Sequence, residues 1–168
     1  MEYRRLTPED AEQYRELRLM ALRTDADAFS TDFNEARQRP VSATAKNLAN
    51  PAAVTFGAYG EGRLLAIMTL FRLSGKKTSH RAEVLAVYAR EESRGAGIAS
   101  TLFGHLLAFA GEWEGLEQLE LAVNSENSRA IDFYDRFGFT RIGILPNAQQ
   151  TDGRYIDELM MVLKLGNE

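Results

Sequence analysis

A chain of 168 residues suits one domain with a single sizeable hydrophobic core. Its net charge of −4 argues against nucleic acid as the main partner, because phosphate binding requires a basic surface, and it favours a cationic or neutral substrate. The absence of cysteine excludes disulfides, thiolate metal sites and a covalent cysteinyl intermediate.

The first residues of the chain predict neither a leader nor a membrane anchor. Residues 1–5 lack the apolar core of a signal peptide. No apolar run approaches the ~18 residues needed to cross a bilayer. We therefore expect a cytoplasmic protein with no membrane partner.

The first third of the chain is predicted to be helical. Residues 7–10 combine a hydroxyl cap, a proline and two acids, which is typical of a helix start. Spaced apolar residues extend this helix to about Arg23. A weaker helix is predicted between Asp32 and Leu48, interrupted at Pro40.

The middle of the chain is predicted to form strands. Residues 53–59 and 64–73 flank a Gly-Glu-Gly turn and read as a hairpin. Residues 82–88 are mostly apolar, as expected of a central strand. A helix over residues 98–113 follows, and its apolar face is formed by Leu102, Leu106, Phe109 and Trp113.

The last third alternates again between strands and a helix. We expect a strand at 119–123, a helix capped by Ser125 that ends near Gly138, and strands at 139–145 and 155–165. The strand–helix alternation from 82 to 145 predicts a mixed sheet with helices packed on it.

A loop with two glycines, residues 94–99 (Arg-Gly-Ala-Gly-Ile-Ala), joins the central strand to the next helix. Glycines at such a junction let backbone N–H groups approach an anion, the helix N-terminus adds partial positive charge, and Arg94 can pair with a phosphate oxygen. The alternative is a turn that merely requires glycine. This loop does not match a Walker A loop, because the chain has no Gly-Lys-Ser/Thr triplet. It does not match a Rossmann fingerprint either, which would need glycine in place of Ser100.

A second motif lies on the helix that follows Asn124. Asn127, Ala130, Ile131 and Tyr134 fall at i, i+3, i+4 and i+7 and therefore share one helical face. Taken singly, Asn127 is as well explained by helix capping, and Tyr134 by burial in the core.

Together, and in this order, the two motifs resemble those of the GNAT family of N-acetyltransferases. The loop matches Gln/Arg-x-x-Gly-x-Gly/Ala, the acyl-CoA-binding signature, and the helix matches Asn-x-x-Ala-x-x-Phe-Tyr followed by Gly-Phe. The chain departs from the pattern at Glu91 and Glu92, since the family often has proline two or three residues before the Arg/Gln. The resemblance covers most of the chain and implies an α/β (α+β) fold for residues 1–168 as one domain, with a mixed, mostly antiparallel central sheet flanked by helices.

The resemblance also implies acetyl-CoA as the cofactor, without a metal. The diphosphate is expected on the amides of the loop and the pantetheine on the backbone of the central strand. The cofactor-binding residues implied are Val87, Tyr88, Ala89, Arg94, Gly95, Ala96, Gly97, Ile98, Ala99, Ser100, Asn127, Ala130 and Tyr134.

Acetyl transfer to an amine requires a base, because an alkylammonium has a pKa of about 10.4. Glu83 is the predicted base, since strand alternation puts it on the same face as Leu85 and Val87. The alternatives for Glu83 are a solvated group or a charge paired with Arg81, and His80 is the second candidate base.

The resemblance implies that Tyr134 protonates the departing thiolate. With no cysteine available, direct attack in a ternary complex is the expected route. The predicted acceptor is a small-molecule amine, an amino acid or analogue or a polyamine, because residues 155–158 (Tyr-Ile-Asp-Glu) resemble those of members that acetylate such amines. The predicted acceptor contacts are Phe29, Ser30, Glu83 and Asp157. A protein amine as acceptor, a non-catalytic acyl-CoA sensor and a homodimer remain open alternatives.

Overall fold

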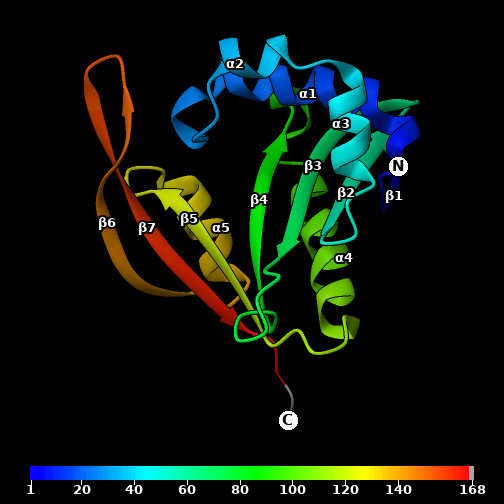
Figure 1. Ribbon diagram of the computed structural model, residues 1–168. Helices are drawn as coiled ribbons and strands as arrows, with labels where there is room; N and C mark the ends of the chain where they lie inside the picture. The colour runs from blue at the N-terminus through cyan, green and yellow to red at the C-terminus, as the bar shows by residue number, and fades with distance from the viewer. Residues whose placement is uncertain (167–168) are drawn as a thin grey trace.

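The computed structural model describes residues 1–166 and arranges them around one seven-stranded sheet of order β1-β2-β3-β4-β5-β7-β6 (Figure 1). Neighbouring strands are antiparallel except for the parallel pair β4–β5. The mixed, mostly antiparallel sheet flanked by helices is therefore confirmed. The strands are β1 (Glu2–Arg5), β2 (Ala53–Gly60), β3 (Arg63–Arg72), β4 (Arg81–Ala89), β5 (Gln118–Asn124), β6 (Thr140–Thr151) and β7 (Arg154–Lys164).

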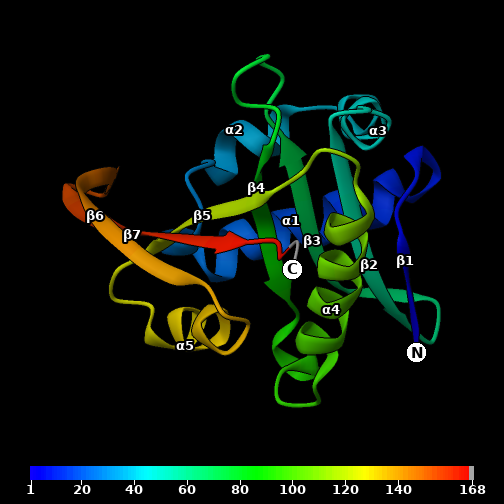
Figure 2. The same cartoon turned by 90° about the horizontal axis from the view of Figure 1, so that it is seen from below.

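Helices cover both faces of this sheet, as Figures 1 and 2 show from two directions. One face carries α1 and α3, and the other carries α4 and α5. The helices are α1 (Ala11–Thr24), α2 (Phe33–Gln38), α3 (Val41–Leu48), α4 (Ile98–Glu112) and α5 (Ser128–Arg136), with short 3-10 segments η1 (Pro8–Asp10), η2 (Ala26–Ala28) and η3 (Glu91–Ser93). Among residues 1–166, none of these helices is long and apolar enough to span a bilayer.

Each face of the sheet has its own hydrophobic core. Beneath α4 and α5, Leu102 and Leu106 are completely buried, as their spacing on the predicted apolar face requires. Beneath α1 and α3, Leu17 and Ala21 pack with Ile67 of β3. The core in which a buried residue of a central strand packs therefore shows whether its side chain points to the α1 face or to the α4 face of the sheet.

Several element boundaries differ from the prediction. Strand β1 was missed, because its sequence Glu-Tyr-Arg-Arg has no apolar alternation and its pairing with β2 is tertiary. Asn127, not Ser125, caps α5: its Oδ1 accepts the N–H of Ala130 at 3.1 Å. Strand β6 continues past Pro146 to Thr151 because the register shifts there.

Strands β4 and β5 diverge soon after they meet. Only Arg81–Glu83 pair in parallel with Gln118–Glu120. Beyond these residues the two strands separate, as the green and yellow arrows of Figure 1 show. The backbone of the second half of β4 is therefore left without a neighbouring strand on its β5 side.

Candidate functional site

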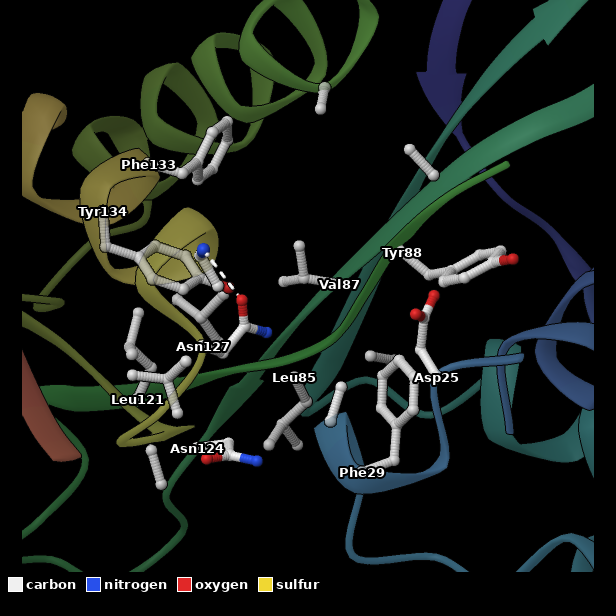
Figure 3. Close-up of a pocket in the computed structure, with 18 of the residues that line it drawn as sticks. Asp25, Phe29, Leu85, Val87, Tyr88, Leu121, Asn124, Asn127, Phe133 and Tyr134 are labelled. Carbon is white, nitrogen blue, oxygen red and sulfur yellow. Dashed lines mark hydrogen bonds between the residues drawn. The ribbon is translucent and has the colours of Figure 1, made fainter. Parts of the chain in front are cut away.

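A cleft of about 980 Å³ opens where β4 and β5 diverge (Figure 3). Its walls come from β4, β5, the N-terminus of α4, helix α5 and the segment after α1. This volume lies at the upper end of the ~300–1,000 Å³ that ligand pockets usually enclose, and it suits a long ligand.

The loop before α4 is built to receive an anion at one end of this cleft. Gly95 and Gly97 have φ values of +82° and +76°, a region that side-chain-bearing residues rarely adopt. A Cβ at either position would meet no atom within 4 Å, so the space above the loop is open. Gly97 begins α4 without a capping side chain, and the first N–H groups of a helix have no intrahelical acceptor. Residues 95–100 therefore offer backbone N–H groups to an anion at this end of the cleft.

Arg94, which is predicted to pair with a phosphate, lines the cleft and has protein partners there. Its Nε donates to the carbonyl of Ala89 at 2.9 Å, and its Nη2 lies 2.6 Å from the carboxylate of Asp25. Arg94 thus joins the end of β4 to the end of α1 beside the glycine loop. Nearby, Glu92 forms a surface ion pair with Arg63 at 3.2 Å and does not line the cleft.

A β-bulge in β4 sets the direction of the side chains in the cleft. Ala86 has a φ of +53°, and the register passes from Thr69 opposite Leu85 to Ile67 opposite Tyr88, so one residue of β3 faces two of β4. Before the bulge, Val84 belongs to the core of the α4 face; after it, Tyr88 belongs to the core of the α1 face.

The bulge makes one sequence prediction wrong. Val87 packs against the core of the α4 face, whereas Glu83 and Leu85 alternate with residues of that core and face α1. Figure 3 shows Val87 and Leu85 on opposite sides of β4. Glu83 therefore shares a face with Leu85 but not with Val87, because simple alternation does not continue through a bulge.

Glu83 lines the cleft and is half-buried. The alternative expectation was that Glu83 pairs with Arg81. Arg81 instead forms an ion pair with Glu120, in which its Nη2 lies 2.6 Å from Oε1. His80 does not line the cleft; its carbonyl accepts the N–H of Glu117 at 2.8 Å. Of the two candidate bases, the structure brings Glu83 alone into the cleft.

Tyr134 extends from α5 toward Val87 across the cleft (Figure 3). Its side chain is buried, and its ring packs edge-on against Phe103 and Phe139 with centroid distances of 6.0 and 5.7 Å. Burial raises the pKa of Tyr134 well above its ordinary value. The hydroxyl therefore keeps its proton at neutral pH and is available as a donor.

The predicted acceptor contacts divide into two groups. Phe29 and Ser30 line the cleft, from the segment that follows α1. Asp157 does not: it is exposed, and its Oδ1 accepts the N–H of Asn147 at 2.8 Å. The next residue, Glu158, does line the cleft, where its Oε1 accepts from Gln149 at 2.6 Å.

Several cleft residues were not foreseen from the sequence. Tyr14 and Arg18 line the cleft from α1, and Thr69 lines it from β3. The available signal was the i, i+4 spacing of Tyr14 and Arg18 beside Leu17, which places two polar groups next to the inward face of an amphipathic helix. Within residues 1–166, no group of three or more His, Cys, Asp or Glu side chains could hold a metal ion.

Comparison with known proteins agrees with this geometry. The model of the acetyltransferase (GNAT) family matches residues 16–139, about three quarters of the chain. The chain belongs to the GNAT family of acetyltransferases.

Its relatives include the L-methionine sulfoximine/L-methionine sulfone acetyltransferase of Pseudomonas aeruginosa, which is 34% identical over 80 residues. That match covers 48% of this chain and spans only 46% of the relative's length. The L-amino acid N-acetyltransferase AaaT of Escherichia coli is 26% identical over 102 residues, which cover 60% of this chain and 62% of that protein.

Solved structures share the whole fold. The structure of yncA from Salmonella typhimurium, which contains its cofactor acetyl-CoA, superposes with a TM-score of 0.87 at 19% identity and covers 100% of this chain and 95% of that one. A GNAT-family acetyltransferase from Streptococcus pneumoniae gives a TM-score of 0.87 at 20% identity over 98% of this chain and 99% of that one.

Proposed function

We propose that the chain transfers the acetyl group of acetyl-CoA to the primary amine of a small molecule, an amino acid or an amino-acid analogue. One observation carries this proposal: a single cleft joins the open glycine loop at α4 to Glu83 and Tyr134 where β4 and β5 diverge. The names of relatives that act on methionine sulfoximine and on L-amino acids support the choice of acceptor class.

Binding of acetyl-CoA would use backbone groups at two places. The amides of residues 95–100 would bind the diphosphate, because they lie at a helix N-terminus with open space above the two glycines. The backbone of β4 around Val87, beyond the point where β5 diverges, would bind the pantetheine amides, because no strand pairs with β4 on that side. A backbone N–H at this position would also polarise the thioester carbonyl.

The chemistry would require one proton acceptor and one proton donor. Glu83, on the α1 face of β4, would accept the proton of the acceptor ammonium, directly or through water. The amine nitrogen would then form the new C–N bond as the C–S bond breaks. Tyr134 would donate its proton to the departing sulfur. The second proton that the nitrogen loses as the amide forms would reprotonate Tyr134 through solvent, and Glu83 would release its proton to solvent. Asn127 and Ala130 would support this step by fixing the first turn of α5.

An acceptor screen tests the proposal. Purified protein is incubated with acetyl-CoA and a panel of amino acids, amino-acid analogues, polyamines and peptides, and free thiol is measured. We expect an amino acid or analogue to accelerate thiol release above the rate with acetyl-CoA alone. Release with peptides only would identify a protein-amine acetyltransferase, and binding of acetyl-CoA without release would identify a sensor.

A further inference from the structure

Arg18 on α1 is a partly buried cation that forms no ion pair with the described residues. Its Nη1 is the one buried side-chain nitrogen or oxygen without a hydrogen-bond partner that the structure shows in residues 1–166. Arg90, which is even more deeply buried, is fully engaged by comparison: it donates to the carbonyl of Leu64 at 2.9 Å and pairs with Glu16 at 3.0 Å. A buried guanidinium normally requires an anion, because desolvation is costly without one.

The surroundings of Arg18 show where that anion would lie. Arg18 lines the cleft, and its guanidinium carbon lies 4.4 Å from the centroid of the Phe29 ring, which fixes the plane of the cation. Tyr14, one turn earlier on α1, and Thr69 on β3 line the same part of the cleft. Burial lowers the pKa of Arg18, and the neighbouring Tyr14 offsets part of this effect.

The nearby carboxylates have other partners. Asp25 pairs with Arg94, and Glu120 pairs with Arg81. Glu83 has no ion-pair partner in the described chain and faces α1, as Arg18 faces the sheet from α1. Glu158, which also lines the cleft, accepts from the neutral amide of Gln149 and is in no ion pair that the described residues show. The acceptor side of the cleft therefore combines one unneutralised cation with carboxylates that lack a cationic partner, an arrangement complementary to a molecule that carries both a carboxylate and an ammonium group.

We infer that Arg18 binds the carboxylate of the acceptor, and that the acceptor is consequently a free amino acid or an amino-acid analogue rather than a simple amine or a polyamine. This inference rests on the proposed function and assigns a residue to its acceptor specificity. A planar guanidinium held against an aromatic ring presents its N–H groups to both oxygens of one carboxylate. Phe29 then has two tasks, since it orients Arg18 and forms part of the acceptor wall.

The test compares acceptors that differ only in the carboxylate: L-phenylalanine with phenethylamine, L-leucine with isopentylamine, and L-methionine with 3-(methylthio)propylamine. In the wild type we expect kcat/KM to favour an amino acid over its decarboxylated partner. Arg18→Met should reduce that preference by about 10- to 100-fold, the effect of losing a charge-assisted hydrogen-bond pair. KM for acetyl-CoA should stay unchanged, and Arg18→Lys should restore part of the preference.

Folding does not confound this test. Because Arg18→Met removes a partly buried charge that has no anionic partner, the ligand-free variant should melt at or above the wild-type temperature. Arg15→Met is the matched control on the same helix. Its guanidinium binds the carbonyls of Arg37 and Arg39 away from the cleft, so its loss should lower stability without changing acceptor preference.

A binding arm separates this inference from the proposed function. If no amine releases thiol, the proposed function fails, and the melting temperature with each L-amino acid is then compared in the presence of coenzyme A. A rise in the melting temperature of the wild type with an L-amino acid, absent in Arg18→Met, would support Arg18 as a carboxylate-binding site. An equal preference, or an equal rise, in wild type and Arg18→Met would overturn the inference, as would the absence of any rise.

Discussion

The carboxylate of Asp25 lies 2.6 Å from Nη2 of Arg94, and this ion pair ties the end of α1 to the loop that precedes α4. Arg94 also donates to the carbonyl of Ala89, so the same side chain holds the end of β4. Asp25 begins the segment that carries Phe29 into the cleft. The pair therefore connects the glycine loop with the acceptor wall.

Arg94→Gln and Asp25→Asn should weaken acetyl-CoA binding through the same ion pair. Each single variant should raise Kd by roughly 3- to 10-fold, because the loop loses one partly exposed charge-assisted contact. The double variant should be no worse than the poorer single variant, since both changes break one interaction. Titration calorimetry measures this cycle. Additive losses would instead indicate that Arg94 contacts the phosphate independently of Asp25.

Gly97→Asp should abolish the rise in melting temperature that acetyl-CoA causes in the wild type. The substitution puts a side chain and a negative charge into the open space at the start of α4, where the diphosphate is expected. Gly104→Ala, in the exposed middle of the same helix, is the control. It should keep the full ligand shift and stabilise the free protein by about 0.5–1 kcal/mol. A normal ligand shift in folded Gly97→Asp would remove the loop from the cofactor site.

Tyr134→Phe should reduce turnover by roughly 10²–10⁴-fold, the usual contribution of general acid catalysis. Stability and Kd for acetyl-CoA should change little, because the ring and its packing against Phe103 remain. Since burial raises the pKa of Tyr134, the wild type should show no loss of kcat from tyrosine ionisation between pH 7 and about pH 10. Turnover within about threefold of wild type in a well-folded variant would leave Tyr134 as a packing residue.

Glu83→Gln should lower kcat/KM most at neutral pH and progressively less at alkaline pH. The reason is that a base is needed only while the acceptor is protonated, and free amine becomes abundant as the pH approaches about 10. Glu117→Gln is the control, because Glu117 is exposed and lies outside the cleft. Steady-state kinetics across this pH range decides the role: a loss of equal size at every pH would indicate that Glu83 positions the acceptor.

Asp10 should stabilise the fold at neutral pH, and this contribution to stability should be lost in acid. Its carboxylate accepts hydrogen bonds from Arg4 at 2.7 and 2.9 Å, from Tyr59 at 2.7 Å and from the N–H of Thr7 at 2.8 Å. The Arg4 guanidinium, together with these donors, holds the pKa of Asp10 well below its usual range, and burial raises the pKa of Tyr59 to about 12. A depressed carboxylate pKa stabilises the fold above about pH 4, and this stability is lost as the pH falls through the folded-state value.

Asp10→Asn should therefore cost about 1–3 kcal/mol at pH 7 and progressively less below about pH 4, where the wild type loses the same contribution. Thermal melts of both proteins between pH 2 and pH 7 measure the difference. A difference that stays constant over this whole range would show that the charge of Asp10 does not matter.

The sequence predicted the order of α4, β5 and α5 because each has a period and a boundary signal of its own. Apolar spacing identified the buried face of α4, and the glycine loop marked its start. Strand β1 had neither signal, since its charged residues form a strand only by pairing with β2. The strand predicted at 139–145 is longer in the structure, because a register shift between Leu145 and Gln149 lets β6 continue to Thr151.

The site was predicted where local backbone chemistry determines it and missed where tertiary packing does. Gly95 and Gly97 require glycine for their positive φ, so the loop was visible in the sequence. The bulge at Ala86 was not visible, because alanine gives no sign of a positive φ. The partners of Arg94 and the isolation of Arg18 depend on how α1 lies against the sheet, which no single segment encodes.

Product analysis is the decisive test of acetyl transfer to the amine of a small acceptor in this cleft. Acetyl-CoA and the best acceptor from the screen are incubated with wild type, Tyr134→Phe and Gly97→Asp, and both free thiol and acceptor mass are quantified. The proposed function predicts an N-acetylated acceptor in amounts equal to the thiol released, with strongly reduced product in both variants. Thiol release without an acetylated acceptor, or equal product from wild type and Gly97→Asp, would contradict it.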